Sequence, residues 1–234
     1  MAARVAGRDD RVLLLGVTPE LAGLGRQLVA VDRHRGMVER HWPGDHDDRR
    51  VLIGDWRDLP LPDTCVDAVV GDGCLTVLPS DQHARVFAEV ARVLRPGGRF
   101  VMRLFAGPED PETVAHVCAE AMLGRIPNFW AFRWRLMMAA ASRFARHDVP
   151  VREGWRAFEA HLPDRDACAR AAGWARATID AIDRYRDAVD VYCFAPASAV
   201  CASLSDDFVD ARLIATQGYD LAERCPLLIA ERRA

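Results

Sequence analysis

Apolar residues gather in short, unbroken runs along the first part of the chain, rather than at every second position. Five such runs cover residues 11–16, 27–32, 51–55, 66–73 and 99–105. Runs without polar alternation are typical of strands that are covered on both faces, which is the condition of a parallel sheet. The pattern therefore predicts five strands within the first 105 residues.

A helical period separates the last two of these runs. Apolar residues from Phe87 to Leu94 recur at i, i+3, i+4 and i+7, and Ser80 or Asp81 precedes them as a candidate cap. The Pro96-Gly97-Gly98 sequence then ends the helix and turns the chain into the fifth strand. Alternating strands and helices predict an α/β fold.

The second half of the chain has a different pattern. Residues 106–205 contain helical periods with little strand character, broken by Pro127, Pro150 and Pro163. Strand character returns at residues 208–215 and 225–233. The short connection between these two runs predicts an antiparallel pair at the end of the sheet.

Glycine or aspartate follows the ends of the first three predicted strands. Gly16 closes the first run, Asp32 the second and Asp55 the third. Because the carboxyl ends of parallel strands meet at one edge of a sheet, backbone amides and carboxylates there can contact a ribose and an adenine. The sequence therefore predicts a site for a nucleotide-like cofactor.

Composition narrows the class of protein. The 234 residues are 50% apolar, enough for one sizeable core, and the net charge is −3 although all 31 basic residues are arginine. A nucleic-acid partner is disfavoured because such proteins carry a clear positive excess. The seven cysteines form no CxxC pair, no secretory leader is visible and no apolar stretch is long enough to span a membrane. We therefore expect a cytoplasmic protein without a membrane partner.

Two longer segments resemble class I S-adenosylmethionine-dependent methyltransferases. They are LPLPDTCVDAVVGDGCLTVLP at residues 59–79 and EVARVLRPGGRFVMRLF at residues 89–105, and the acidic strand ends at Asp32 and Gly54-Asp55 match as well. The resemblance covers residues 11–105, with the final strand pair also fitting. It implies S-adenosylmethionine as cofactor and a Rossmann-like seven-stranded mixed sheet, its last strand antiparallel, flanked by helices and carrying a helical insertion.

On this basis the chain divides into three parts. We expect residues 1–105 to form the N-terminal part of the cofactor-binding α/β domain, residues 106–205 to form a helical insertion or lid that contacts the substrate or a partner, and residues 206–234 to complete the sheet with the antiparallel pair.

The first glycine-rich turn departs from the family pattern. The family's turn usually resembles DxGxGxG, whereas residues 14–20 read LLGVTPE, so that only Gly16 remains. Glycine permits positive φ and lets the backbone approach a ligand closely, and Thr18 and Glu20 remove that freedom. Pro19 stiffens the turn and can open a following helix. A reshaped cofactor pocket is therefore expected.

The resemblance also implies roles for individual residues. Asp32 would accept hydrogen bonds from both ribose hydroxyls, and Asp55 would accept one from the adenine amino group, with Trp56 beside the base. The expected cofactor contacts are Gly16, Val17, Thr18, Glu20, Asp32, Arg33, Gly54, Asp55, Trp56, Asp72 and Gly73. Other interpretations stay open: Asp32 as a solvated strand end, Trp56 as a packing residue, Glu20 as a helix cap, and Arg33 with His34 as surface side chains.

Asp72, Gly73 and Cys74 follow the fourth strand, where the family places residues that touch both cofactor and substrate. Asp72 can orient a nucleophile or take its proton, or it can merely cap the next turn. No histidine is placed by sequence to activate Cys74, so it is assigned only to the lining of the substrate pocket. No general base can be assigned from the sequence.

Aromatic residues are dense around residues 128–144. Trp130 and Trp134 are candidate substrate contacts, and the same stretch can instead form a subunit contact or the core of the insertion. His34, His41 and His46 match no compact ligand spacing, so a polar loop is expected rather than a metal site.

The leading hypothesis is methyl transfer from S-adenosylmethionine to a small-molecule acceptor. The rival is a non-catalytic relative that keeps the fold as a binding or scaffold subunit, with the insertion joining a second copy or a partner subunit. A nicotinamide-dependent dehydrogenase is set aside because the chain has no GxGxxG after the first strand and no lysine.

Overall fold

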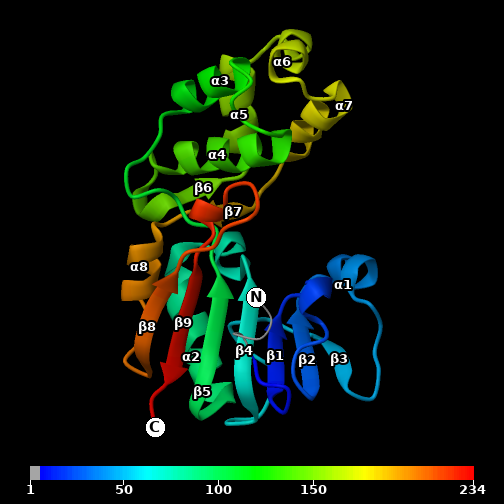
Figure 1. Cartoon of the computed structure of the whole chain (residues 1–234), viewed down its shortest axis with the longest axis vertical. Coiled ribbons are helices and arrows are strands. Elements are labelled where there is room, and N and C mark those ends of the chain that lie inside the picture. The colour runs from blue at the N-terminus through cyan, green and yellow to red at the C-terminus, as the bar shows by residue number, and fades with distance from the viewer. Residues whose placement is uncertain (1–5) are drawn as a thin grey trace.

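The computed structural model describes residues 6–234 and has two parts, a sheet and a helical part (Figure 1). The strands of the main sheet are β1 (Arg11–Leu15), β2 (Gln27–Asp32), β3 (Arg49–Ile53), β4 (Val66–Asp72), β5 (Leu94–Arg103), β8 (Phe208–Ile214) and β9 (Leu227–Arg232). They form a seven-stranded sheet in the order β3-β2-β1-β4-β5-β9-β8. β1 to β5 pair in parallel, and β9 is antiparallel to both neighbours. This confirms the predicted mixed sheet with its last strand antiparallel.

Continuous apolar runs form the central strands because both faces of the sheet are covered. Leu13, Leu14 and Leu15 of β1 are fully buried although their side chains alternate between the faces. One face packs against α2 (His83–Val93), with Phe87 at the centre of that contact. The other face is covered in part by the segment between β1 and β2, through Val17 and other apolar residues.

The connection between β1 and β2 contains no α-helix. Only one 3-10 turn, η2 (Pro19–Leu21), forms there, with Pro19 at its first position. Residues 16–26 are fewer than the dozen that a helical crossover between parallel strands normally needs. The helix expected after Pro19 is therefore absent, and no helix N-terminus faces the end of β1.

The helix before β5 ends at Val93, before the expected Leu94, and it does not begin with a side-chain cap as predicted. α2 ends at Val93, and the turn at Pro96-Gly97-Gly98 lies inside an irregular start of β5. No side chain caps α2 at its N-terminus. Ser80, one of the expected caps, instead donates its hydroxyl to the Asp148 carboxylate at 2.7 Å and ties this end of α2 to the helical part.

The helical part stands beyond the carboxyl ends of the parallel strands (Figure 1). Its helices are α3 (Val114–Met122), α4 (Phe129–Ala141), α5 (Arg152–His161), α6 (Arg165–Ala172) and α7 (Arg176–Ile179), whereas α8 (Ala197–Ala202) packs beside β8 on the sheet. Phe129, Phe132 and Phe158 are fully buried at the centre of its core. The crowded aromatic helix therefore serves mainly as core.

A two-stranded antiparallel sheet also lies in this part, and the hydrophobic pattern did not predict it. It consists of β6 (Asp148–Pro150) and β7 (Val191–Cys193). Strands of three residues are too short to display a period of two, which is why the pattern read as helix and loop.

The segments around Gly107 and Pro196 lie side by side where the helical part meets the sheet. Gly107 pairs with Pro196 there, and a Cβ at Gly107 would lie 2.4 Å from the Phe194 carbonyl oxygen. Only glycine allows the two backbones to approach this closely. Among residues 6–234, no helix is both long and apolar enough to cross a membrane.

Candidate functional site

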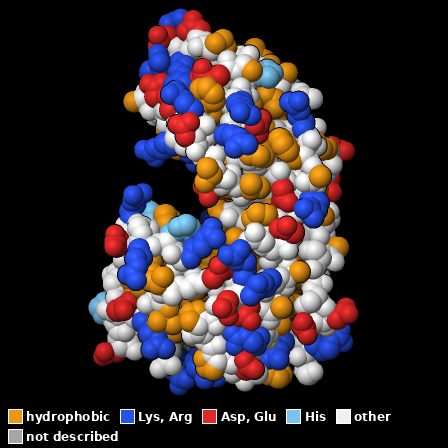
Figure 2. Space-filling view, turned by 180° about the vertical axis from the view of Figure 1, so that it is seen from behind, with side chains coloured by type: hydrophobic (Ala, Val, Ile, Leu, Met, Phe, Trp, Pro, Cys, Tyr) orange, Lys and Arg blue, Asp and Glu red, His pale blue; other side chains and the backbone are white. Residues whose placement is uncertain are grey.

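A cavity of about 580 Å³ lies at the carboxyl ends of β1, β2 and β4, below the helical part. Its volume is in the range of sites for small organic ligands. Figure 2 shows the molecule hollowed between the helical part and the edge of the sheet, with histidine side chains on the lower rim. The lining residues are Leu15, Gly16, Val17, Thr18, Pro19, Asp32, Arg33, His34, Met37, His41, Gly54, Asp55, Trp56, Asp72, Gly73, Cys74, Val77, Leu78, Asp190 and Tyr192.

Most of the predicted site residues meet in this cavity. The segment from Gly16 to Thr18, Asp32, Arg33, the segment from Gly54 to Trp56, and the segment from Asp72 to Cys74 all line it. They meet because parallel pairing brings the carboxyl ends of neighbouring strands to the same edge of the sheet.

Asp32 is a buried carboxylate with one free oxygen. Its side chain is 7% exposed, and Oδ1 accepts the backbone N–H of His34 at 2.8 Å. Oδ2 has no hydrogen-bond donor among residues 6–234 and lies beside Gly16, 4.0 Å from where a Cβ would stand. Because Asp32 lines the cavity, this oxygen is open to a hydrogen bond from a ligand.

Gly16 and Trp56 form the floor beside Asp32. Gly16 has φ +88°, a conformation that L side chains rarely adopt, and its N–H donates to the Val31 carbonyl at 2.8 Å. The indole N–H of Trp56 donates to the same carbonyl at 2.6 Å. The indole N–H is therefore committed to the backbone, and Trp56 offers a ligand only its ring.

Asp55 does not present a free carboxylate. Arg57, two residues later in a tight turn, donates to Asp55 Oδ1 through its backbone N–H at 2.9 Å and its Nε at 2.8 Å, and to Oδ2 through Nη2. The hydrogen bonds from Arg57 lower the pKa of Asp55 to about 2. Asp55 therefore carries an ion pair with Arg57 that the sequence did not indicate, and its contact with an adenine amino group stays a prediction.

Asp72 is also paired with an arginine. Arg103 donates Nε to Oδ1 and Nη2 to Oδ2, both at 2.6 Å, and the Asp72 side chain is only 14% exposed. Both oxygens of this carboxylate are therefore engaged by one guanidinium. The ion pair holds Asp72 at the end of β4, and the two roles expected for it stay predictions.

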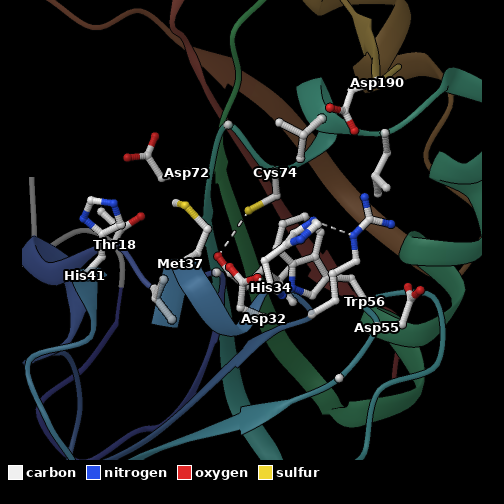
Figure 3. A pocket seen from close by; sticks show the side chains of 18 of the residues that line it. Thr18, Asp32, His34, Met37, His41, Asp55, Trp56, Asp72, Cys74 and Asp190 are labelled. Atoms are coloured by element: carbon white, nitrogen blue, oxygen red, sulfur yellow. Dashed lines mark hydrogen bonds between the residues drawn. The ribbon is translucent and has the colours of Figure 1, made fainter. Parts of the chain in front are cut away.

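Gly73 and Cys74 shape the same end of the cavity. Gly73 has φ +66°, and a Cβ there would lie 2.6 Å from the Phe105 ring. The Cys74 thiol donates to the Leu15 carbonyl at 3.2 Å, drawn as a dashed line in Figure 3. Burial raises the pKa of this thiol to about 12, so Cys74 lines the cavity as a neutral side chain.

Three predicted residues do not reach the cavity. Glu20 is exposed on η2, because the missing helix after Pro19 lets the turn point outward. Trp130 is 46% exposed on α4, with the Arg133 guanidinium 4.7 Å from the centre of its ring. Trp134 packs one layer behind the cavity wall, between Phe105 at 5.0 Å and the rings of β7.

Nine lining residues were not among the predicted contacts: His34, Met37, His41, Val77, Leu78, Asp190, Tyr192, Leu15 and Pro19. The first three lie at or in α1 (Arg35–His41), which follows β2 and borders the cavity. In Figure 3, Asp190 enters from the side of the helical part, across from Asp32 and Trp56. The sequence carried no usable signal for Asp190 and Tyr192, since β7 is too short to show a strand period.

No group of three or more His, Cys, Asp or Glu side chains within residues 6–234 could hold a metal ion. His34 belongs to no such group within residues 6–234, and its ring accepts a hydrogen bond from Arg33 Nε at 2.9 Å.

Comparisons with known proteins agree with this geometry. A family model described as a methyltransferase domain matches residues 16–102. A demethylmenaquinone methyltransferase from Mycobacterium sp. (strain KMS) is 34% identical over 184 residues, which cover 75% of this chain and 72% of the relative.

Two solved structures share the fold. An S-adenosylmethionine-dependent methyltransferase from Mesorhizobium loti aligns with a TM-score of 0.54 at 15% identity, covering 98% of this chain and 94% of that one. A Rhodobacter sphaeroides protein titled as a putative Zn-dependent alcohol dehydrogenase aligns with a TM-score of 0.58 at 14% identity, covering 98% and 86%. At these identities the likeness concerns the fold alone.

Proposed function

The chain belongs to the class I S-adenosylmethionine-dependent methyltransferase family, and from this premise we propose a hydroxylated aromatic ring of the reduced-quinone class as its acceptor. It is an enzyme that transfers a methyl group from S-adenosylmethionine to a small-molecule acceptor. The relatives named demethylmenaquinone methyltransferase support the choice of acceptor. So do Val77, Leu78 and Tyr192, which give the cavity an apolar and aromatic wall opposite Asp32.

The residues of the strand ends fit the cofactor. When bound, S-adenosylmethionine supplies a methyl group that its sulfonium makes electrophilic. We propose that Asp32 accepts the ribose hydroxyls through its free Oδ2, because that oxygen lies in the cavity beside the Gly16 turn and lacks a protein donor. Gly54, the Asp55 backbone and the Trp56 ring then border the adenine.

The methionyl end is held differently from the family pattern in this proposal. No helix N-terminus faces it, and η2 is too short to provide one. The backbone N–H groups of Val17 and Thr18, which donate to no carbonyl of residues 6–234, lie at the cavity and can bind the carboxylate. Arg33 also lines the cavity, but its charge acts on Asp55, at the adenine end of this proposal.

The acceptor would lie between the strand ends and β7. A quinone ring is electron-poor, so attack on an electrophilic methyl group requires the reduced, hydroxylated form of the ring. The enzyme contributes chiefly by holding this ring and the methyl group close and in line.

We also propose a contact surface on the helical part and a cellular location. Met122, Leu123 and Trp130 are exposed apolar side chains on the helical part, and a second copy or a partner subunit would cover them. Residues 106–205 would act as the lid over the acceptor. A cytoplasmic location fits the seven cysteines, all of which are free thiols.

The observation that carries the proposal is the cavity itself, with a half-free buried carboxylate on one wall and a tyrosine on the other. It is tested by incubating the enzyme with S-adenosylmethionine labelled on the methyl group and 2-prenyl-1,4-naphthohydroquinone under anaerobic conditions. Label should pass into the organic phase, and the oxidised quinone should accept none. Tight binding of S-adenosylhomocysteine without transfer to this quinol, together with transfer to an amine or a carboxylate, would contradict the choice of acceptor.

A further inference from the structure

Four carboxylates line the cavity, and their partners differ. Asp55 and Asp72 are each held by an arginine on both oxygens, and Asp32 accepts a backbone N–H on one oxygen. Asp190 alone has no side-chain hydrogen bond and no ion pair with any described residue. An exposed carboxylate without a partner remains available to a proton or to a ligand hydroxyl.

The backbone around β7 aims Asp190 and Tyr192 at the same space. Side chains two residues apart on a strand point to the same face, and both of these side chains line the cavity. The segment is anchored at both ends, because the Asp190 carbonyl accepts Val151 N–H at 2.9 Å and Phe194 N–H donates to the His147 carbonyl at 3.1 Å. β7 also packs against η3 (Cys74–Val77), the first turn after β4.

An aromatic stack holds the Tyr192 ring in place. Trp134 lies parallel to it at 6.2 Å, and Tyr185 and Phe194 meet it edge-on at 6.5 and 6.2 Å. Its hydroxyl has no hydrogen-bond partner among the described residues, so a ligand in the cavity can take that place. Burial raises the pKa of Tyr192, the Arg133 guanidinium lowers it and the Asp190 charge raises it, with a net rise that keeps the phenol a donor.

We propose that Asp190 accepts the hydroxyl proton of the acceptor during methyl transfer, and that Tyr192 donates a hydrogen bond that orients the same oxygen. This assignment rests on the proposed function. Cys74 and Asp72 lie nearer the end of β4, but the thiol is bonded to a carbonyl and the carboxylate to an arginine.

The proposed step transfers one proton to Asp190 and one methyl group to the acceptor. The O–H bond of the acceptor breaks and its proton moves to an Asp190 carboxylate oxygen, which leaves the electron pair on the acceptor oxygen and, by conjugation, on the neighbouring ring carbon. The oxygen or this ring carbon then forms the new bond to the methyl group, while the electron pair of the S–C bond returns to sulfur. Attack through carbon ends with loss of the ring proton to water, and no oxidant or reductant is consumed.

The variants Asp190→Asn and Tyr192→Phe test the two roles separately, with Asp187→Asn as a matched control outside the cavity lining. The probe is 2-prenyl-1,4-naphthohydroquinone, kept reduced. For Asp190→Asn we expect kcat to fall about a hundredfold at neutral pH, with recovery as pH approaches the pKa of the free quinol. For Tyr192→Phe we expect KM for the quinol to rise about fivefold with kcat nearly unchanged, the value of one hydrogen bond.

Binding supplies a readout that does not depend on turnover. Quenching of tryptophan fluorescence by the quinol, with S-adenosylhomocysteine present, should weaken about fivefold in Tyr192→Phe and remain unchanged in Asp187→Asn. The titratable and charged groups around Asp190 that a pH profile must account for are Asp32, Arg33, His34, His41, Asp55, Asp72, Arg133 and Tyr192.

Retention of kcat within threefold in Asp190→Asn, with the pH profile of the wild type, would overturn the role of Asp190. Unchanged KM and unchanged quenching in Tyr192→Phe would overturn the role of Tyr192. Failure of the wild-type enzyme itself to methylate or bind any reduced naphthoquinone, with normal binding of S-adenosylhomocysteine, would instead reject the proposed acceptor and remove the ground of this assignment.

Discussion

The cavity has one wall formed by the strand ends and another formed by the helical part. Both walls carry aspartates, but the carboxylates differ in whether other groups of the protein pair with them. The strand-end wall has three aspartates, of which two are neutralised by arginine and the third is half occupied by the backbone. The helical wall has one aspartate, Asp190, without any described partner. The position of a carboxylate determines which part of a ligand it can contact. Its hydrogen-bond and ion-pair partners determine whether it can also accept a proton or a hydrogen bond from that ligand.

The origin of the neutralised pairs differs between the two strand ends. Asp55 meets Arg57 within one tight turn, so that pair is local. Asp72 meets Arg103 because β4 and β5 pair in parallel and place the two residues at the same register. The second pair therefore depends on the whole sheet and should matter more for stability.

The largest expected effect comes from breaking that register pair. Arg103→Met would leave the mostly buried Asp72 without its counter-charge, and we expect the free energy of unfolding to fall by about 3 kcal/mol. Arg99→Met on the same strand removes an ion pair whose arginine is 42% exposed, so its cost should stay below about 1 kcal/mol. Urea denaturation compares the two variants. Equal losses would mean that the Asp72 pair is no different from a surface contact.

The next effect concerns the half-free carboxylate on the strand-end wall. Asp32→Ala should weaken binding of S-adenosylhomocysteine by about thirtyfold, the value of one charge-assisted hydrogen bond of about 2 kcal/mol. Calorimetry measures it, with Glu20→Ala as the control because that side chain lies outside the cavity. Equal affinity in wild type and Asp32→Ala would place the ribose elsewhere.

Much of this wall could be predicted from the sequence. Unbroken apolar runs located β1 to β4, and parallel pairing then brought Gly16, Asp32 and Asp72 to one edge. The partners could not be predicted. Arg103 meets Asp72 only after the irregular start of β5 has set the register, and no local pattern encodes that shift.

The helical wall could not be predicted, for different reasons. α4 is apolar on nearly every side, so its pattern did not distinguish the buried Phe132 from the exposed Trp130. Tyr192 lies in β7, which begins directly after Asp190, and pairs with Val149, which is about forty residues earlier in the chain. Only the folded structure brings that wall to the ends of β1 and β2.

A smaller effect is expected at the floor of the cavity. Trp56→Phe keeps a ring beside Gly16 but removes the N–H that donates to the Val31 carbonyl, and we expect a loss of about 1 kcal/mol in stability. Trp130→Phe is the matched change on an exposed tryptophan and should stay within about 0.5 kcal/mol. Thermal unfolding distinguishes them, and identical midpoints would show that the indole hydrogen bond contributes nothing.

The smallest effect depends on pH. Since the pKa of Asp55 is lowered from 3.8 to about 2, its pairing with Arg57 stabilises the fold above pH 4 and loses this effect as pH falls towards 2. The difference in urea midpoint between wild type and Asp55→Asn should therefore be constant from pH 7 to about 4 and shrink below that. Because the pair is partly exposed, the difference should be small at every pH. A difference that grows on acidification would contradict the assigned pair.

A crystal structure with S-adenosylhomocysteine tests the central claim most directly, through the distances from the Asp32 carboxylate to the two ribose hydroxyls. The account predicts that at least one hydroxyl donates to Oδ2 at about 2.5–2.9 Å, with the adenine beside Trp56. A nucleoside bound away from the Gly16 turn, with Asp32 still bonded only to the His34 backbone, would contradict it.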